Sequence, residues 1–255
     1  MRYTTLGSGT ISLTPGRACS GHLIEAGAML ILMDCGSGVA HGLSRLGIDW
    51  TSISHVALTH FHIDHHGDLP SLVFAWKYGI LPPRSAPLEI IGPVGTLDLL
   101  TRLAAAYGEW LLAPGWPLTI REIAPGEALD LGSGVRLEAV KVPHTPESVA
   151  YSVGRGARRI VYSGDTGPSL ELAQWATGAD LLVLECSLPT AMAIREHLTP
   201  EQCAAIAAEA RPGRLALVHF YPPVENVDIR ALVGAAFTGP VTLAHDGWQF
   251  EIEDD

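Results

Sequence analysis

Short apolar runs typical of buried β-strands recur along the chain and alternate with segments of helical periodicity. The apolar runs predict strands at residues 22–26, 29–34, 53–59, 88–91, 135–142, 159–162, 180–184, 215–218 and 241–244. The helical patterns cover residues 39–46, 69–78, 95–107, 169–176, 200–210 and 229–236. This alternation predicts a layered α/β protein, and because many strands are apolar on both faces we expect buried sheets.

The sequence contains no segment that would divide the chain into separate domains. Its two stretches rich in proline and glycine, residues 81–87 and 113–117, are short and predict surface loops. A length of 255 residues is within the range of one large domain. We therefore predict a single domain over residues 1–255.

Composition narrows the class of protein. Hydrophobic residues make up 47% and charged residues 17% of the chain, which excludes a disordered chain and a charge-rich coiled coil. The apolar runs are far shorter than the roughly 20 residues that span a bilayer, and the N-terminus does not resemble a secretory signal. The 4 cysteines are scattered, which favours a reducing compartment. We expect a cytoplasmic protein that does not bind membranes.

Histidines are concentrated in one segment: residues 60–66 read His-Phe-His-Ile-Asp-His-His. This segment directly follows a predicted strand, and the carboxyl ends of strands are where open α/β folds place their chemistry. Imidazole and carboxylate groups together suit a borderline metal such as zinc. A solvated polar loop is the alternative, but so dense a cluster is improbable by composition. The segment therefore predicts a metal site.

Further histidines and acidic residues stand at the ends of other predicted strands. The residues placed in this way are His144, Asp165, Glu185 and His219. Each of them alone would more often be a structural residue than a ligand. As a set, and together with residues 60–65, they are better explained by one shared metal centre.

The ordered series of candidate ligands resembles the metallo-β-lactamase superfamily. The hallmark of that family is a strand followed by a His-x-His-x-Asp-His loop, which residues 56–65 match, and residues 33–36 match its earlier strand-Asp-Cys-Gly turn. The resemblance covers residues 6–252. It implies a four-layer αββα sandwich with a site for two metal ions, usually zinc, with manganese or iron as alternatives.

The resemblance also assigns the ligands residue by residue. It implies that the first metal is held by His60, His62 and His144, the second by Asp64, His65 and His219, and both by Asp165. Metal-bound imidazoles need a hydrogen-bond acceptor for their other nitrogen. Asp34 and Asp68 are the candidates for this supporting role.

Asp165 indicates which branch of the family the chain resembles. Members that open β-lactams generally lack this aspartate, so that branch is disfavoured. Residues 182–187 and 196–200 resemble the ribonuclease Z and arylsulfatase-like branch, where a glutamate and a histidine act together beside the leaving group. The implied reaction is hydrolysis by a hydroxide shared between the two metals. Asp64 would orient this hydroxide, while His197, oriented by Glu185, would donate a proton to the leaving oxygen.

Two features favour small esters over transfer RNA as substrates. Short-type members that process transfer RNA carry a long flexible arm between the third ligand histidine and the bridging aspartate, but here only residues 145–164 separate these positions. In addition, 16 Lys and Arg against 27 Asp and Glu give a net charge of −11, which disfavours general nucleic-acid binding. We expect a homodimeric hydrolase of small phosphodiesters or aryl sulfates. The alternatives are a ribonuclease Z-type tRNA 3′ endonuclease and a lactone or β-lactam hydrolase.

Overall fold

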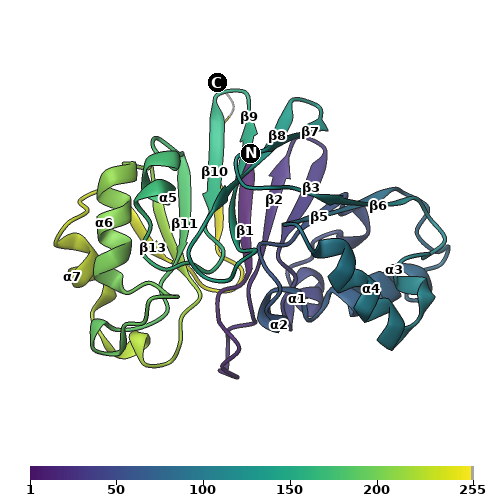
Figure 1. Cartoon of the computed structure of the whole chain (residues 1–255), viewed down its shortest axis with the longest axis horizontal. Helices are drawn as coiled ribbons and strands as arrows, with labels where there is room; N and C mark the ends of the chain where they lie inside the picture. The colour runs from purple at the N-terminus through teal and green to yellow at the C-terminus, as the bar shows by residue number, and fades with distance from the viewer. Residues whose placement is uncertain (254–255) are drawn as a thin grey trace.

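The computed structural model describes residues 1–253 and contains two seven-stranded β-sheets packed face to face, with helices on both outer faces (Figure 1). The first sheet has the strand order β14-β1-β2-β3-β4-β5-β6. In chain order its strands are β1 (Arg2–Gly7), β2 (Gly21–Ala26), β3 (Met29–Met33), β4 (His55–Ala57), β5 (Leu88–Gly92), β6 (Leu118–Glu122) and β14 (Gln249–Glu251).

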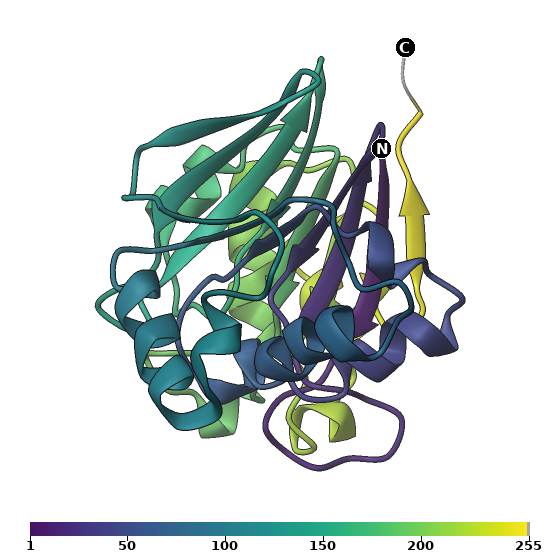
Figure 2. The same ribbon diagram turned by 90° about the vertical axis from the view of Figure 1, so that its right-hand side faces the viewer.

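The second sheet has the order β13-β12-β11-β10-β9-β8-β7. Its strands are β7 (Ala128–Gly132), β8 (Val135–Lys141), β9 (Val149–Arg155), β10 (Arg158–Tyr162), β11 (Leu181–Glu185), β12 (Leu215–Val218) and β13 (Val241–Leu243). Figure 2 shows the purple strands of the first sheet and the green strands of the second as two layers. A continuous apolar cluster fills the space between them, with side chains such as Ile31, Met33, Tyr151 and Val183.

Helices cover the outer face of each sheet. One set packs on the first sheet through an apolar cluster that includes Leu43 and Trp76, and it consists of α1 (Val39–Arg45), α3 (Leu69–Tyr78) and α4 (Thr96–Tyr107). The other set packs on the second sheet and consists of α5 (Leu170–Trp175), α6 (Pro200–Ala210) and α7 (Ile229–Gly234). The remaining α-helix of the described residues, α2 (Ile63–His66), is a single turn. The predicted four-layer αββα architecture is therefore confirmed.

Parallel strands bring several chain segments to one edge of the molecule. Strands β3 to β6 run parallel in the first sheet, and β10 to β13 run parallel in the second. Their carboxyl ends lie at the lower edge in Figure 1, where α2 is also found. Carboxyl ends of parallel strands are where α/β folds place their ligands. This edge is therefore where the predicted site residues should be sought.

All nine predicted strands occur, with bounds shifted by a few residues, but the structure adds five that the pattern does not predict. The added strands are β1, β6, β7, β9 and β14. Strands β6 and β7 consist of half-buried and exposed residues, so they contain no apolar run. In β9, Ser152 and Gly154 interrupt the apolar positions although Ser152 is buried. Half-exposed strands and strands that bury polar residues contain no continuous apolar run, so an apolar pattern does not predict them.

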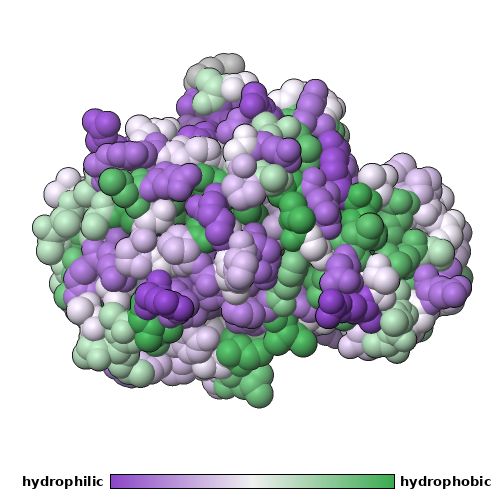
Figure 3. Space-filling model, in the orientation of Figure 1, coloured by the Kyte–Doolittle hydropathy of each residue, from purple (hydrophilic) through white to green (hydrophobic). Residues whose placement is uncertain are grey.

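The surface mixes polar and apolar residues on the face drawn in Figure 3. A hydrophobic projection at its lower edge coincides with the loop between β1 and β2 in Figure 1. Ile11 and Leu13 on this loop are 48% and 97% exposed. Among the helices of residues 1–253, none is both long enough and apolar enough to cross a membrane.

Candidate metal centre

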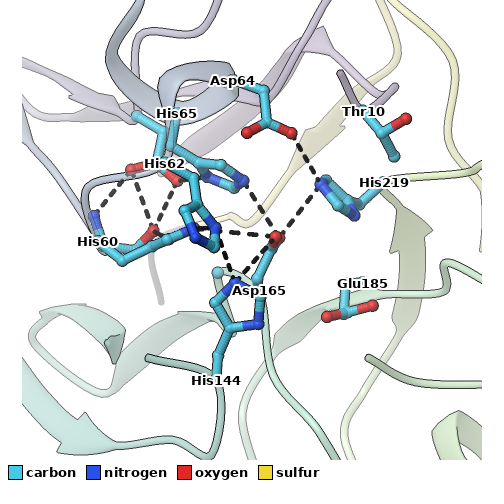
Figure 4. Close-up of polar contacts among 12 residues, drawn as sticks. Thr10, His60, His62, Asp64, His65, His144, Asp165, Glu185 and His219 are labelled. Carbon is cyan, nitrogen blue, oxygen red and sulfur yellow. Dashed lines mark hydrogen bonds and ion pairs between the residues drawn. The ribbon is translucent and has the colours of Figure 1, made fainter. Parts of the chain in front are cut away.

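The seven predicted metal ligands lie together at the carboxyl edge of the two sheets (Figure 4). They come from three segments of the second sheet and from the segment that follows β4 in the first. The donor atoms form two clusters that meet at Asp165: His60, His62 and His144 on one side, and Asp64, His65 and His219 on the other. The structure thus brings together residues as far apart in sequence as His60 and His219.

The first cluster consists of three imidazoles and one oxygen of Asp165. His62 Nδ1 lies 3.1 Å from His60 Nε2 and 3.0 Å from His144 Nε2. Asp165 Oδ2 lies 3.8 Å from His60 Nε2 and 3.7 Å from His144 Nε2. His62 is exposed to solvent, so this cluster is open on one side.

The second cluster is enclosed and uses the other oxygen of Asp165. Asp165 Oδ1 lies 3.2 Å from His65 Nε2 and 3.3 Å from His219 Nε2. His219 Nε2 is in turn 3.6 Å from Asp64 Oδ2. Three of these buried atoms, His65 Nε2, His219 Nε2 and Asp165 Oδ1, lack a hydrogen-bond partner within residues 1–253. Buried polar atoms are normally paired, so this cluster has the character of an ion site.

Close backbone packing places the segment that contains Asp64 and His65. The Cys35 N–H donates to His65 O over 2.7 Å, which ties the turn after β3 to α2. At Gly36, a Cβ atom would lie only 1.9 Å from Asp64 O, so no larger residue fits there. This contact explains the Asp-Cys-Gly turn that the sequence places after β3.

Each imidazole has one ring nitrogen that points away from the clusters. In four of the histidines this nitrogen has a hydrogen-bond partner. His65 Nδ1 bonds Asp34 Oδ2 at 2.7 Å, and His219 Nδ1 lies 2.9 Å from Ser187 Oγ. His144 Nδ1 donates to the backbone oxygen of Glu196 at 2.9 Å. The fourth pair is His60 Nδ1 and Thr59 Oγ1, at 3.1 Å. Such partners orient a ring and select the nitrogen that is left for a metal.

Glu185 and His197 form a pair beside the second cluster. Glu185 ends β11, and its Oε1 lies 2.9 Å from His197 Nδ1. The imidazole of His197 stacks on that of His219, with ring centroids 5.6 Å apart. A ring nitrogen of His197 also lies within 4.8 Å of donor atoms of Asp165 and His219. The Nε2 atom of His197 is therefore the one that can meet a substrate.

The surroundings of the site shift the pKa values of one carboxylate and two imidazoles. Burial raises the pKa of Asp165, but the imidazoles of His219 and His65 outweigh this and hold it well below its usual value. Burial lowers the pKa of His197, but the hydrogen bond and charge of Glu185 raise it to about 9. Burial holds the pKa of His60 well below its usual value, which keeps this ring neutral and able to act as a ligand.

Two expectations about this region are wrong. Residues 63–66 form the one-turn helix α2, so the ligand segment is only partly a loop. Asp68 does not support an imidazole; its Oδ2 accepts from the N–H groups of Gly38 and Ala40, at 2.8 and 3.0 Å, at the start of α1. Asp34 does contact His65, one of the candidate ligands, as predicted. Ser187, which contacts His219, lies within the motif of residues 182–187, but the sequence pattern assigns it no role.

Comparison with known proteins identifies the family. The family model described as the β-lactamase superfamily domain matches residues 30–220, which is most of the chain. The chain belongs to the metallo-β-lactamase superfamily. The matched region contains all seven residues of the two clusters.

Within the metallo-β-lactamase superfamily, the chain is similar over nearly its full length to proteins named ribonuclease Z. One from Mycobacterium sp. strain KMS is 31% identical, over 99% of this chain and 96% of its own. Among solved structures, the metallo-β-lactamase fold protein YhfI from Bacillus subtilis has a TM-score of 0.84 at 25% identity, with 98% of both chains covered. The short form of human tRNase Z has a TM-score of 0.81 at 26% identity, with 100% of both covered.

Proposed function

We propose that this protein is a binuclear, metal-dependent phosphodiesterase that hydrolyses small phosphodiesters. The observation that carries the proposal is the position of Asp165, whose two oxygens face two separate clusters of donor atoms. The Glu185–His197 pair adjoins these clusters and provides a proton donor for a leaving group. The donor clusters alone would also fit a metal-binding scaffold without activity, and the Glu185–His197 pair alone would not indicate hydrolysis. Only the two together favour an ester hydrolase.

The donor atoms fit zinc. Two ligands that are each about 2.0–2.1 Å from a tetrahedral zinc ion lie about 3.3–3.4 Å from each other. The distances within the first cluster are 3.0–3.8 Å and those within the second are 3.2–3.6 Å. Two ions would also satisfy the buried atoms that lack hydrogen bonds. Manganese and iron accept the same imidazole and carboxylate ligands, so the identity of the metal needs direct analysis.

Different residues of the site have different roles in the proposed hydrolysis. Bound metal ions supply Lewis-acid polarisation and an activated water, as two-metal phosphodiesterases require. Asp64, at the edge of the second cluster, orients the attacking water. His197 donates the proton of Nε2 to the departing oxygen, while Glu185 accepts a hydrogen bond from Nδ1 and keeps the ring aligned.

The border of the site supports a small substrate. Exposed apolar side chains lie on segments next to the clusters, namely Ile11, Leu13, Ile63, Met192 and Ile194. The loop that contains Ile11 and Leu13 is joined to the site at its base, because the His219 N–H donates to Ser8 O at 2.8 Å. Such a border suits a substrate with an apolar or aromatic group, such as a nucleobase.

Cations that could hold an RNA backbone are already paired near the site. Arg17 forms an ion pair with Glu225, and Arg195 forms one with its neighbour Glu196. Lys141 donates to two backbone oxygens, those of Thr145 and Ser148. The segment between His144 and Asp165 is largely the hairpin of β9 and β10, so it leaves no room for a flexible arm. Polyanion binding depends on several available cations.

A ribonuclease Z-type activity is the second candidate, and the names of the relatives favour it. It uses the same chemistry, because tRNA 3′ processing also cleaves a phosphodiester.

A panel of substrates separates the candidates. Purified protein with bound zinc should be tested on bis-(p-nitrophenyl) phosphate, cyclic nucleotides, p-nitrophenyl sulfate, a lactone, a β-lactam and precursor tRNA. We expect the phosphodiesters to be cleaved fastest. Efficient, site-specific trimming of precursor tRNA at physiological salt, or faster sulfate hydrolysis, would contradict the proposal.

We also propose that the protein acts as a homodimer in the cytoplasm. Both statements derive from the sequence interpretation and the resemblance to the ribonuclease Z branch. Light scattering on purified protein tests the first, since a monomer at micromolar concentration would contradict it. Fractionation of cells tests the second.

A further inference from the structure

Ser187 lies between the second cluster and the Glu185–His197 pair. It follows β11 by two residues, and its side chain is fully buried. Its Oγ lies 2.9 Å from His219 Nδ1 and donates a hydrogen bond to Glu185 Oε2. One hydroxyl group therefore contacts both a candidate metal ligand and the residue that orients the proton donor.

The chemistry of a hydroxyl group fixes the direction of these hydrogen bonds. Serine has one hydrogen to donate, and the carboxylate oxygen of Glu185 is the stronger acceptor. Ser187 Oγ must then accept from His219, so the hydrogen of the imidazole resides on Nδ1. Nε2 of His219 keeps its lone pair and points to Asp165 Oδ1 at 3.3 Å and Asp64 Oδ2 at 3.6 Å. This is the tautomer that can bind a metal through Nε2.

We propose that Ser187 is a positioning residue that sets the tautomer and orientation of His219, and thereby the affinity of the second cluster for its metal ion. The inference rests on the two-metal site of the proposed function. Its effect should fall on His219 more than on His197, because Ser187 Oγ lies 3.4 Å from His197 Nδ1 but only 2.9 Å from His219 Nδ1, and because Glu185 has other partners. The N–H of Thr166 donates to Oε1 at 2.7 Å and that of Leu198 to Oε2 at 3.1 Å.

Chelator competition with the metal-loaded protein tests the inference without any substrate. We expect Ser187→Ala to lose one of its two ions at a chelator concentration about 10–100-fold lower than wild type, the usual effect of removing a partner of a metal-binding imidazole. Ser187→Thr, which keeps the hydroxyl, should retain both ions. Ser152→Ala is the matched control, because it removes another buried hydroxyl, one that accepts from Arg159 Nε at 2.7 Å in the outer part of the sheet.

The outcomes separate this inference from the proposed function. Retention of both ions by Ser187→Ala at wild-type chelator concentrations would overturn the inference, as would equal losses in Ser187→Ala and Ser152→Ala. A wild-type protein that binds fewer than two ions would instead contradict the proposed function. If Ser187→Ala does not fold, Ser187→Cys, with its weaker hydrogen-bonding group, should show the same selective loss of one ion.

Leaving-group dependence provides a second readout. At saturating zinc, Ser187→Ala should slow alkyl and nitrophenyl phosphodiesters by the same factor, because His197 keeps its bond to Glu185. A selective loss on alkyl substrates would show that Ser187 acts through Glu185 and His197, and it would overturn the assignment to His219.

Discussion

The two clusters that share Asp165 differ in exposure and in what supports them. The first is open to solvent at His62, and its outer hydrogen bonds go to a backbone oxygen and a threonine hydroxyl. The second is buried, and its imidazoles bond to the side chains of Asp34 and Ser187. The same ligand types are therefore held in two different environments.

In the proposed two-metal enzyme, this difference implies different roles for the two metal sites. A buried cluster whose rings are oriented by side chains should hold its ion tightly, because little reorganisation is needed on binding. An open cluster can exchange water and admit a substrate oxygen. The Glu185–His197 pair stands next to the buried cluster, so the leaving group of a bound ester would lie on that side.

The largest effect is expected when the two clusters lose their shared residue. Asp165→Ala should lose both ions, and its activity should fall by more than about 100-fold, the upper figure for residues that only support a ligand. Metal analysis and turnover of bis-(p-nitrophenyl) phosphate measure this. Normal turnover with both ions retained would show that Asp165 does not join the clusters.

The proton donor can be tested by varying the leaving group. His197→Ala should keep both ions, because all seven candidate ligands remain. Cleavage of alkyl phosphodiesters should fall by about 10²–10⁴-fold, the usual value of general acid catalysis, while nitrophenyl esters change little. Equal slowing of both substrates would place His197 against the phosphoryl group, and no slowing would leave it without a catalytic role.

The hydrogen bond between Asp34 and His65 can be weakened without changing any candidate ligand. Asp34→Asn removes the charge that faces His65, so one ion should be lost at a chelator concentration about 10–100-fold lower than in wild type. Asp68→Asn is the matched control, because the Asp68 carboxylate accepts from backbone N–H groups at the start of α1. Metal retention that is the same in both variants would contradict a supporting role for Asp34.

The last expected effect is on the pH dependence of stability, not on metal binding or turnover, and it concerns His22 behind the buried cluster. His22 is fully buried, and burial lowers its pKa to about 3, so the native state keeps it neutral. Between its unfolded pKa of 6.5 and about pH 3, the unfolded chain binds a proton that the native chain does not. The free energy of unfolding should therefore fall with decreasing pH in this window, by at most about 5 kcal/mol.

His22→Phe should make this pH dependence shallower. The phenyl ring can occupy the same place against Tyr162, whose ring centroid is 4.6 Å from that of His22. Denaturant unfolding of both proteins between pH 6 and pH 4, with saturating zinc, measures the difference. Parallel curves for the variant and wild type would show that His22 does not contribute.

The strand-end pattern indicated candidate ligands, and the family resemblance assigned seven of them to two metals. An apolar run followed by His144, Asp165 or His219 indicates both the strand and the edge at which the side chain emerges. Side-chain direction between distant segments is not encoded in such local patterns. The pattern therefore did not reveal that His62 faces the cluster through Nδ1, that Asp68 bonds the start of α1, or that Ser187 contacts His219.

The family resemblance and the local pattern contributed different parts of the fold. Alternating strands and helices predicted a layered α/β protein, but the αββα sandwich came from the resemblance. Strands such as β6 and β7 were missed because neither buries a continuous apolar face. Their pairing is determined by neighbouring strands, β5 and β8, which a single-sequence pattern does not place beside them.

The most direct test of the two-cluster account is a count of metal ions in purified wild-type protein. Elemental analysis after dialysis against metal-free buffer should find two transition-metal ions per chain. Asp165→Ala, treated in the same way, should hold fewer than one. A wild-type value of one or less, or an Asp165→Ala value equal to that of wild type, would contradict the claim that Asp165 joins two metal sites.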